Sequence, residues 1–203
     1  GALTLPFCHP ATLPLLLLLL PLLLTPASLA DTTVYRVGKV LTMNADDAVI
    51  NNAAVVVRDG KIQSVGKASE IKVPDGATVI DMPDCWLVPG FVDAHNHTAG
   101  GLGDLNDMVY LTNPGLRTLD TVRPESDDVK QARAGGVTTA LLIPGSGTNI
   151  SGFGTLVKFA GKSVDEMVIK APGSIKVAQA GNPERYWYGV GRTMMNYNTR
   201  RTF

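Results

Sequence analysis

The chain of 203 residues carries 18 Lys and Arg against 18 Asp and Glu, so it has no net charge. This balance excludes any charge-based case for nucleic-acid binding, because binding a polyanion depends on an excess of Lys and Arg. All of these charges lie from Asp31 onward, and only two of the three histidines, His95 and His97, fall in that charged part. We therefore distinguish an uncharged leader from a globular stretch whose chemistry centres on the two histidines.

Residues 1–30 form the leader, whose centre, Leu13–Leu24, is a Leu-rich run interrupted by Pro21. A membrane-spanning helix needs about 20 apolar residues, so this run is too short for a stable anchor. A short apolar core followed by small residues, here Ser28 and Ala30, is the pattern of a secretory signal peptide. We expect its removal to leave a secreted or periplasmic protein without a stable membrane anchor. An uncleaved anchor is the alternative.

The two cysteines, Cys8 and Cys85, are divided between the leader and the rest of the chain. Export leads to a compartment where disulfides form, but loss of the leader leaves Cys85 without an intrachain partner. Because Cys85 lies in an apolar, strand-like context, we interpret it as a buried small hydrophobic side chain rather than a nucleophile.

Residues 31–88 predict short β-strands separated by turns. Val- and Ile-rich runs bounded by Gly, Pro, Asn and Asp are typical of small antiparallel strands. The clearest feature is a hairpin at Arg58–Lys61, because Asp59 and Gly60 suit the positive φ values of a two-residue turn. We expect a small β-sandwich or open sheet. The predicted strands are Val34–Leu41, Ala53–Arg58, Lys61–Val65, Thr78–Asp81 and Cys85–Val88.

After Gly90 the sequence alternates between Gly-rich loops, strands and helices. A helix is predicted over Asp127–Ala134, capped by Ser126 and ended by Gly135-Gly136. The following run, Val137–Ile143, is almost wholly apolar, and such a strand after a helix is typical of a buried parallel sheet covered by helices. Further strands are predicted at Phe91–His97, Met167–Ile169 and Ser174–Val177.

The Gly-rich stretch Pro144–Gly154 follows this strand but lacks the spacing of a nucleotide-binding loop. Ile150 stands where a dinucleotide fingerprint needs Gly, and no Gly-Lys-Ser/Thr follows for a phosphate loop. We interpret the stretch as a strand-end loop beside an active site, and its glycosylation sequon at Asn149 as chance. Ser146 and Ser151 have no His left to serve as a base if the His pair binds metal, which argues against a serine hydrolase.

The segment Phe91–His97 carries both histidines of the charged part of the chain. Because side chains alternate along a strand, Asp93, His95 and His97 are expected on one face. Neutral imidazole is a good zinc ligand, and a pair two residues apart on a strand can supply two ligands. We predict that His95 and His97 bind a metal ion, and that Asp93 orients an imidazole or binds backbone beneath the site. A chance pair on a surface loop is the alternative.

Pro89–His97 resembles the Pro-Gly-x-x-Asp-x-His-x-His motif of the amidohydrolase superfamily, which lies at the first strand of a metal-dependent (β/α)₈ barrel. The β-rich residues 31–88 look like the N-terminal portion of the small β-sandwich of these enzymes, and Ala134–Thr139 is similar to their entry into the second barrel strand. With Ala180–Arg185, the chain looks most like the imidazolonepropionase-related branch. The resemblance implies an α/β fold, with residues 89–203 forming part of a TIM barrel.

The resemblance also implies hydrolysis of a carbon–nitrogen bond in an amide, cyclic amide or peptide. One or two divalent ions, zinc by preference, would activate water. Members of the superfamily carry further His ligands and an acid/base Asp on the last strand, whereas this chain has no His after His97. A complete barrel needs about 250 residues. We therefore expect the chain to be an N-terminal fragment that is truncated within the barrel and inactive alone. We also expect it to be incomplete at its Gly1 start.

Lys170 and Lys176 are both candidates for the Lys that bridges two ions in such enzymes, although an ordinary surface Lys is the simpler interpretation. Two alternatives to an amidohydrolase stay open: a metal-dependent deaminase of the same superfamily, and a non-catalytic exported binding protein on the same scaffold. The expected partner is a small-molecule or peptide substrate. Homo-oligomer formation is left open.

Overall fold

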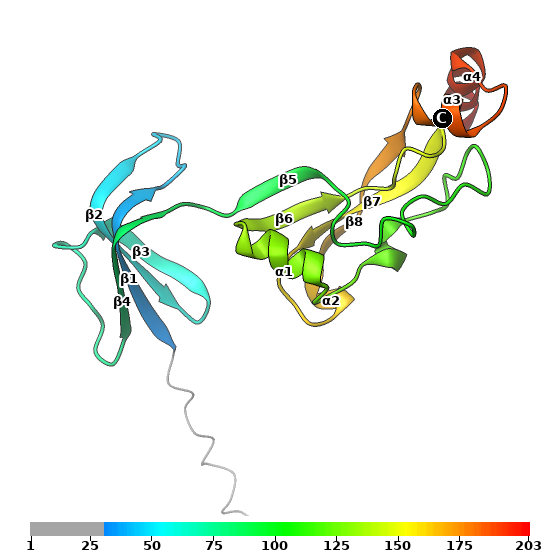
Figure 1. The fold of residues 1–203 in the computed structure, drawn as a ribbon. Helices are drawn as coiled ribbons and strands as arrows, with labels where there is room; N and C mark the ends of the chain where they lie inside the picture. The colour runs from blue at the N-terminus through cyan, green and yellow to red at the C-terminus, as the bar shows by residue number, and fades with distance from the viewer. Residues whose placement is uncertain (1–30) are drawn as a thin grey trace, which may run out of the picture. The chain divides into compact units, whose positions relative to one another are not determined.

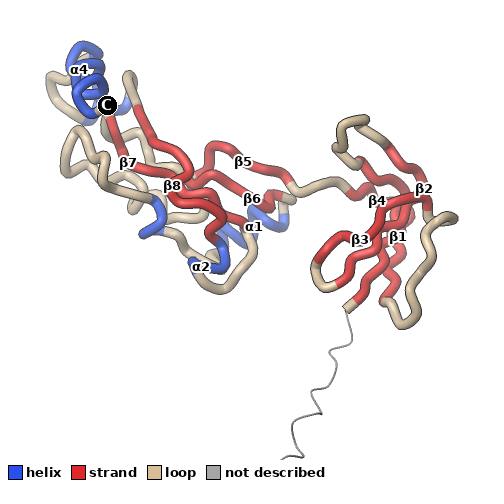
Figure 2. The backbone as a smooth tube through the Cα atoms, turned by 180° about the vertical axis from the view of Figure 1, so that it is seen from behind, coloured by secondary structure: helices blue, strands red, loops and turns tan. Residues whose placement is uncertain are grey.

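The computed structural model describes residues 31–203, which divide into two compact units between Leu87 and Val88 (Figure 1). The sequence predicted a division one residue later. The predicted signal peptide, residues 1–30, lies outside the described residues. Strands dominate both units, and the helices all belong to the second (Figure 2). Within residues 31–203, no helix has the length and apolar character needed to cross a membrane.

The first unit is a four-stranded sheet with the order β3-β2-β1-β4. Strand β1 pairs antiparallel with β2 but parallel with β4, which differs from the expected antiparallel arrangement. The reason is that residues 68–77 cross over from β3 at one edge to β4 at the other, and parallel pairing requires such a crossover. The strands are β1 (Thr32–Leu41), β2 (Val49–Arg58), β3 (Lys61–Lys67) and β4 (Thr78–Leu87).

The predicted hairpin between β2 and β3 is confirmed. Arg58 pairs with Lys61 across a two-residue turn. Its central residues, Asp59 and Gly60, have φ values of 49° and 72°. Positive φ at both positions matches the right-handed twist of the flanking strands, so this turn sets the register of the hairpin.

Apolar clusters cover both faces of this sheet. Val34, Ala54 and Val56 pack on one face against residues of the crossover, among them Ile71 and Val73. On the other side, buried side chains of β1 and β2 pack with partly buried ones of β2 and β4. The single sheet fits the predicted N-terminal portion of a β-sandwich.

Cys85 is exposed, so the prediction that it is buried is wrong. Strand β4 lies at a sheet edge, and its pairing with β1 shifts register between Val37 and Lys39. Gly38 lies at this shift, where an added Cβ would be 2.1 Å from the Pro83 carbonyl oxygen. An apolar run therefore does not imply burial here, because the strand is irregular and at the edge.

The second unit contains a four-stranded sheet with the order β5-β6-β7-β8. Only β5 and β6 pair in parallel, whereas β6, β7 and β8 are successively antiparallel, so the expected parallel sheet is wrong beyond β6. Only residues 143–149 join β6 to β7, and so short a connection cannot return a strand in parallel. The strands are β5 (Phe91–Asn96), β6 (Val137–Leu142), β7 (Ile150–Lys158) and β8 (Val168–Val177).

The Gly-rich stretch Pro144–Gly154 is thus a loop only in its first half, since β7 begins at Ile150. The weak strands predicted on either side of residue 172 belong to the single strand β8. The sequon residue Asn149 is fully buried, and its Nδ2 donates to the Ala178 carbonyl at 2.9 Å. Residues 88–203 therefore form an open mixed sheet, and no closed barrel is present within them.

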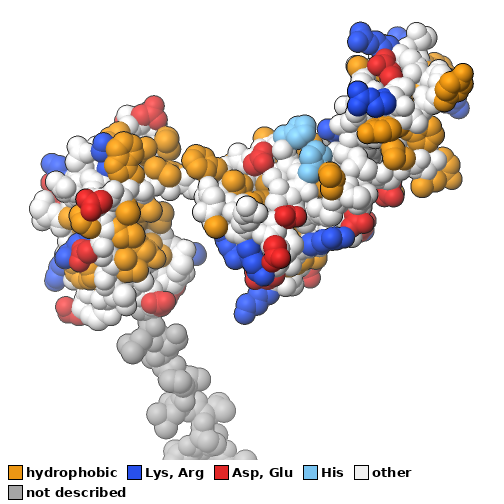
Figure 3. All heavy atoms as spheres, in the orientation of Figure 1, with side chains coloured by type: hydrophobic (Ala, Val, Ile, Leu, Met, Phe, Trp, Pro, Cys, Tyr) orange, Lys and Arg blue, Asp and Glu red, His pale blue; other side chains and the backbone are white. Residues whose placement is uncertain are grey.

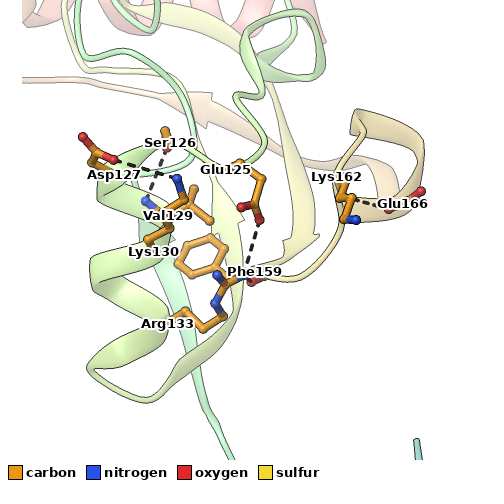
Figure 4. A network of polar contacts seen from close by, with 9 residues as sticks. All are labelled: Glu125, Ser126, Asp127, Val129, Lys130, Arg133, Phe159, Lys162 and Glu166. Carbon is orange, nitrogen blue, oxygen red and sulfur yellow. Dashed lines mark hydrogen bonds and ion pairs between the residues drawn. The ribbon is translucent and has the colours of Figure 1, made fainter. Parts of the chain in front are cut away.

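The predicted helix α1 (Asp127–Ala134) is confirmed and links β5 to β6 (Figure 1). Ser126 Oγ accepts a hydrogen bond from the Val129 amide at 3.3 Å. Val129 is buried in the core, and Arg133 Nη1 donates to the Phe159 carbonyl at 3.0 Å (Figure 4). The other helices are η1 (Thr118–Thr121, 3₁₀), α2 (Val164–Met167), α3 (Asn182–Tyr186) and α4 (Arg192–Thr202).

Candidate metal centre

The two predicted metal ligands lie together at the end of β5. His95 belongs to the strand and His97 follows its last residue, with ring centroids 5.4 Å apart and ring planes at 81°. Figure 3 shows them as adjacent pale blue side chains on the surface of the second unit. Strand β5 lies at an edge of its sheet, which leaves His95 exposed while His97 is half-buried. The local sequence thus places two imidazoles side by side.

His97 is oriented by the end of the neighbouring strand. Its Nδ1 lies 3.0 Å from the Ile143 carbonyl oxygen, directly after β6. A carbonyl can only accept, so Nδ1 donates and Nε2 keeps its lone pair. Partial burial lowers the pKa of His97 from its usual value, against the opposing effect of the Ile143 carbonyl. A neutral ring with one nitrogen fixed by a carbonyl is the form in which His binds metal.

Asp93 shapes the backbone that carries the pair. Its carboxylate accepts from the side-chain amide of Asn96 at 2.9 Å and from the backbone amide of His95 at 3.0 Å. These two donors lower the pKa of Asp93 from its usual value, with Asn96 contributing most. Asn96 is buried and accepts in turn from the Thr98 amide at 2.7 Å. Of the two predicted roles of Asp93, the structure shows the backbone interaction.

The two candidate bridging lysines differ in their surroundings, although both lie on β8. Lys176 is half-buried, and its charge contributes to lowering the pKa of His97. The partial burial of Lys176 also lowers its own pKa. Lys170 is exposed and pairs with Leu156 across the sheet. Of the two lysines, Lys176 is therefore the better candidate for a role at the site.

The side chains of His95 and His97 supply only part of the ligands of a metal site. Among residues 31–203, no group of three or more His, Cys, Asp or Glu side chains is placed to hold an ion. Catalytic zinc usually has three protein ligands and a water molecule. The His95 and His97 pair still fits a metal site, because imidazole side chains are typical ligands for such an ion.

Comparison with known proteins relates this geometry to one group of enzymes. No family model matches the chain. It is 30% identical over 141 residues to an amidohydrolase, tasK, of Hapsidospora irregularis, covering 66% of this chain and 14% of that protein. It is 34% identical over 101 residues to an imidazolonepropionase of Bacillus thuringiensis, covering 44% of this chain and 24% of the relative.

The crystal structure of an amidohydrolase from Thermotoga maritima superposes with a TM-score of 0.72 at 29% identity, covering 83% of this chain and 46% of that one. The chain is thus similar to amidohydrolases in both sequence and fold. It spans about a seventh to a quarter of the length of these two curated relatives.

An open pocket of about 390 Å³ lies beside His97. Gly145 and Ser146 line it, so the first half of the Gly-rich stretch lies where the sequence suggested, next to the candidate site. Met108 and Tyr186 also line it, and sequence reasoning missed both. No spacing signal marks them, because they come from a loop and from α3, which meet only in the folded chain.

Proposed function

We propose that the protein is an exported, metal-dependent amidohydrolase that cleaves a carbon–nitrogen bond in an amide, a cyclic amide or a peptide. The observation that carries this proposal is the His95 and His97 pair at the end of β5, with His97 Nδ1 held by the Ile143 carbonyl. Similarity to amidohydrolases supports hydrolysis at a carbon–nitrogen bond.

In this proposal, Nε2 of His97 and a ring nitrogen of His95 hold a divalent ion, zinc by preference. Such an ion supplies Lewis-acid activation of the scissile carbonyl and of a water molecule. The Ile143 carbonyl fixes the His97 ring, and Asp93 with Asn96 fixes the turn that carries both rings. The proposal includes further ligands and an acid/base group from residues outside 31–203.

Lys176 is proposed as the residue that joins the site from β8 if two ions bind, because it is half-buried on that strand whereas Lys170 is exposed. A Lys176→Ala variant would then hold fewer ions than a Lys170→Ala variant of the same full-length protein. Equal metal content in the two variants would remove Lys176 from the site.

Export rests on the pattern of the leader, in which a short apolar core precedes Ser28 and Ala30. The expected partner is a small-molecule or peptide substrate in the secreted or periplasmic space. N-terminal sequencing of the protein recovered from that compartment should begin near Asp31. Protein recovered from that compartment only with its leader intact would contradict signal-peptide cleavage and favour the uncleaved anchor, whereas its absence from that compartment would contradict export.

The catalytic proposal is tested by turnover of the full-length protein with amides, cyclic amides and short peptides. We expect hydrolysis that is lost on treatment with a chelator and restored by Zn²⁺. Release of ammonia from ring amines, with no amide cleavage, would instead indicate a deaminase. Tight metal binding without turnover of any of these compounds would favour a non-catalytic binding protein.

A further inference from the structure

We infer that the pocket beside His97 receives an uncharged, apolar side group of the substrate, and that Met108 and Tyr186 determine this specificity. The inference rests on the proposed function, because it takes His97 as part of the reacting centre. It deepens that function by naming the class of group recognised next to the scissile bond.

The pocket brings together three large, exposed side chains with apolar parts. Leu102 is 70% exposed, Met108 47% and Tyr186 56%, and all three line the hollow of about 390 Å³. Exposed apolar side chains that gather on a concave surface are typical of ligand-binding sites. The remaining side chains of the wall, apart from His97, are small or amide groups: Asn106, Ser146 and Asn182.

Hydrogen bonds between distant segments build the wall. The Gly145 amide donates to the Leu105 carbonyl at 2.7 Å, which joins the loop after β6 to the loop after β5. Trp187 Nε1 donates to the Gly147 carbonyl at 3.1 Å, which attaches the end of α3 to the same loop. Tyr186 therefore projects from an anchored segment, and the pocket is largely formed before a ligand enters.

The glycines of this loop leave the space that the pocket needs. A Cβ added at Gly145 would lie 1.8 Å from Asn106 Oδ1, and one added at Gly147 would lie 3.0 Å from Met108 Cγ and Sδ. The near atoms all belong to the Asn106 and Met108 side chains, so a side chain added at Gly145 or Gly147 would push these two side chains from their present positions along the pocket wall.

Charged groups of the same region lie around two other hollows, one lined by Asp104, Arg117 and Asp120 and the other by Asp104, Asp120 and Arg123. Arg117 Nε is 2.8 Å from Asp120 Oδ2, and Arg123 pairs with Asp104. Among residues 31–203, no Lys, Arg, Asp or Glu lines the pocket beside His97. An ammonium group entering this pocket would lose hydration without gaining an anionic partner, whereas an apolar group would gain from burial against Leu102, Met108 and Tyr186.

The test uses the full-length protein and three N-acetyl amino acid amides that differ only in the side chain: leucine, lysine and glutamate. We expect kcat/KM to be at least about tenfold higher for the leucine compound, since burial of part of a Leu side chain is worth about a factor of ten. Equal values, or a preference for lysine or glutamate, would overturn the inference.

Two variants test whether the pocket causes the preference for the leucine compound. Met108→Ser and Tyr186→Ser should each raise KM for the leucine compound about tenfold, with little change for the other two. Both side chains are exposed, so neither change removes core packing. Tyr188→Ser is the matched control, because Tyr188 is fully exposed and lies outside the pocket. An equal effect of the control would contradict the assignment to Met108 and Tyr186.

Calorimetric titration with the same three amides separates this inference from the proposed function. If the wild-type protein hydrolyses none of them, the proposed function fails for simple amides, yet selective binding of the leucine compound that is lost in Tyr186→Ser still supports the pocket. Turnover without side-chain selectivity would support the function and overturn the inference. Absence of both turnover and binding would overturn the inference as well.

Discussion

The β1–β3 part of the first unit and the candidate centre of the second differ in how far apart in the sequence their interacting segments lie. In the first unit, β1, β2 and β3 are consecutive neighbours in one sheet, and the turn at Asp59-Gly60 is set by two residues. In the second unit, His97 at the end of β5 contacts the carbonyl of Ile143, 46 residues away. Local sequence specifies the β1–β3 part of the first sheet, whereas the pairing of β1 with β4, such as Thr33 with Thr78, and the candidate centre of the second unit depend on contacts between distant segments.

The largest expected stability effect lies in the first unit, at Gly38. A Gly38→Ala substitution would place a Cβ 2.1 Å from the Pro83 carbonyl oxygen, so β1 and β4 must separate. We expect the free energy of unfolding of this unit to fall by about 2 kcal/mol, measured by hydrogen exchange across β1 and β4. Gly115→Ala, where no atom lies within 4 Å, is the control. Loss of metal binding in Gly38→Ala would show that the two units are coupled, which would contradict their separate treatment.

An intermediate effect is expected at the cap of α1 in the second unit. Ser126→Ala removes the acceptor for the Val129 amide and should lower the stability of this unit by about 1 kcal/mol in urea unfolding. Ser126→Asp keeps an acceptor at the same place and should retain most of the stability. Equal losses in the two variants would show that the cap does not stabilise α1.

The smallest effect is expected at Asp93, and it depends on pH. The hydrogen bonds from Asn96 and the His95 amide lower the pKa of Asp93 in the folded state. Its carboxylate therefore adds stability above its unfolded pKa of about 3.9, and this is lost as pH falls through the lower folded value. Asp93→Asn should lower the urea midpoint at pH 6 and have no effect at low pH. A difference that is independent of pH would contradict an ionic role.

Local signals predicted several elements correctly. Ser126 and Gly135 marked both ends of α1, and the apolar run after Gly136 marked β6. The pair at His95 and His97 could be identified from its spacing, because two positions on one strand suffice to place two rings together.

Other features depend on partners that no local pattern reveals. Cys85 is exposed because β4 is an irregular edge strand. The glycines at the start of β7 suggested a loop, yet at Gly154 a Cβ would lie 2.4 Å from Ser174 Oγ on β8, so glycine there serves close strand packing. Met108 and Tyr186 acquire a shared role only when their segments fold together.

The central claim is that His95 and His97 hold a divalent ion. Zn²⁺ titration of the full-length protein tests it most directly, in a Cys85→Ser background because that exposed thiol is another soft ligand. We predict that Cys85→Ser alone leaves the tightest binding step unchanged, and that adding His95→Ala and His97→Ala weakens it by more than about a hundredfold. Unchanged affinity and stoichiometry in the variant without both histidines would contradict the claim.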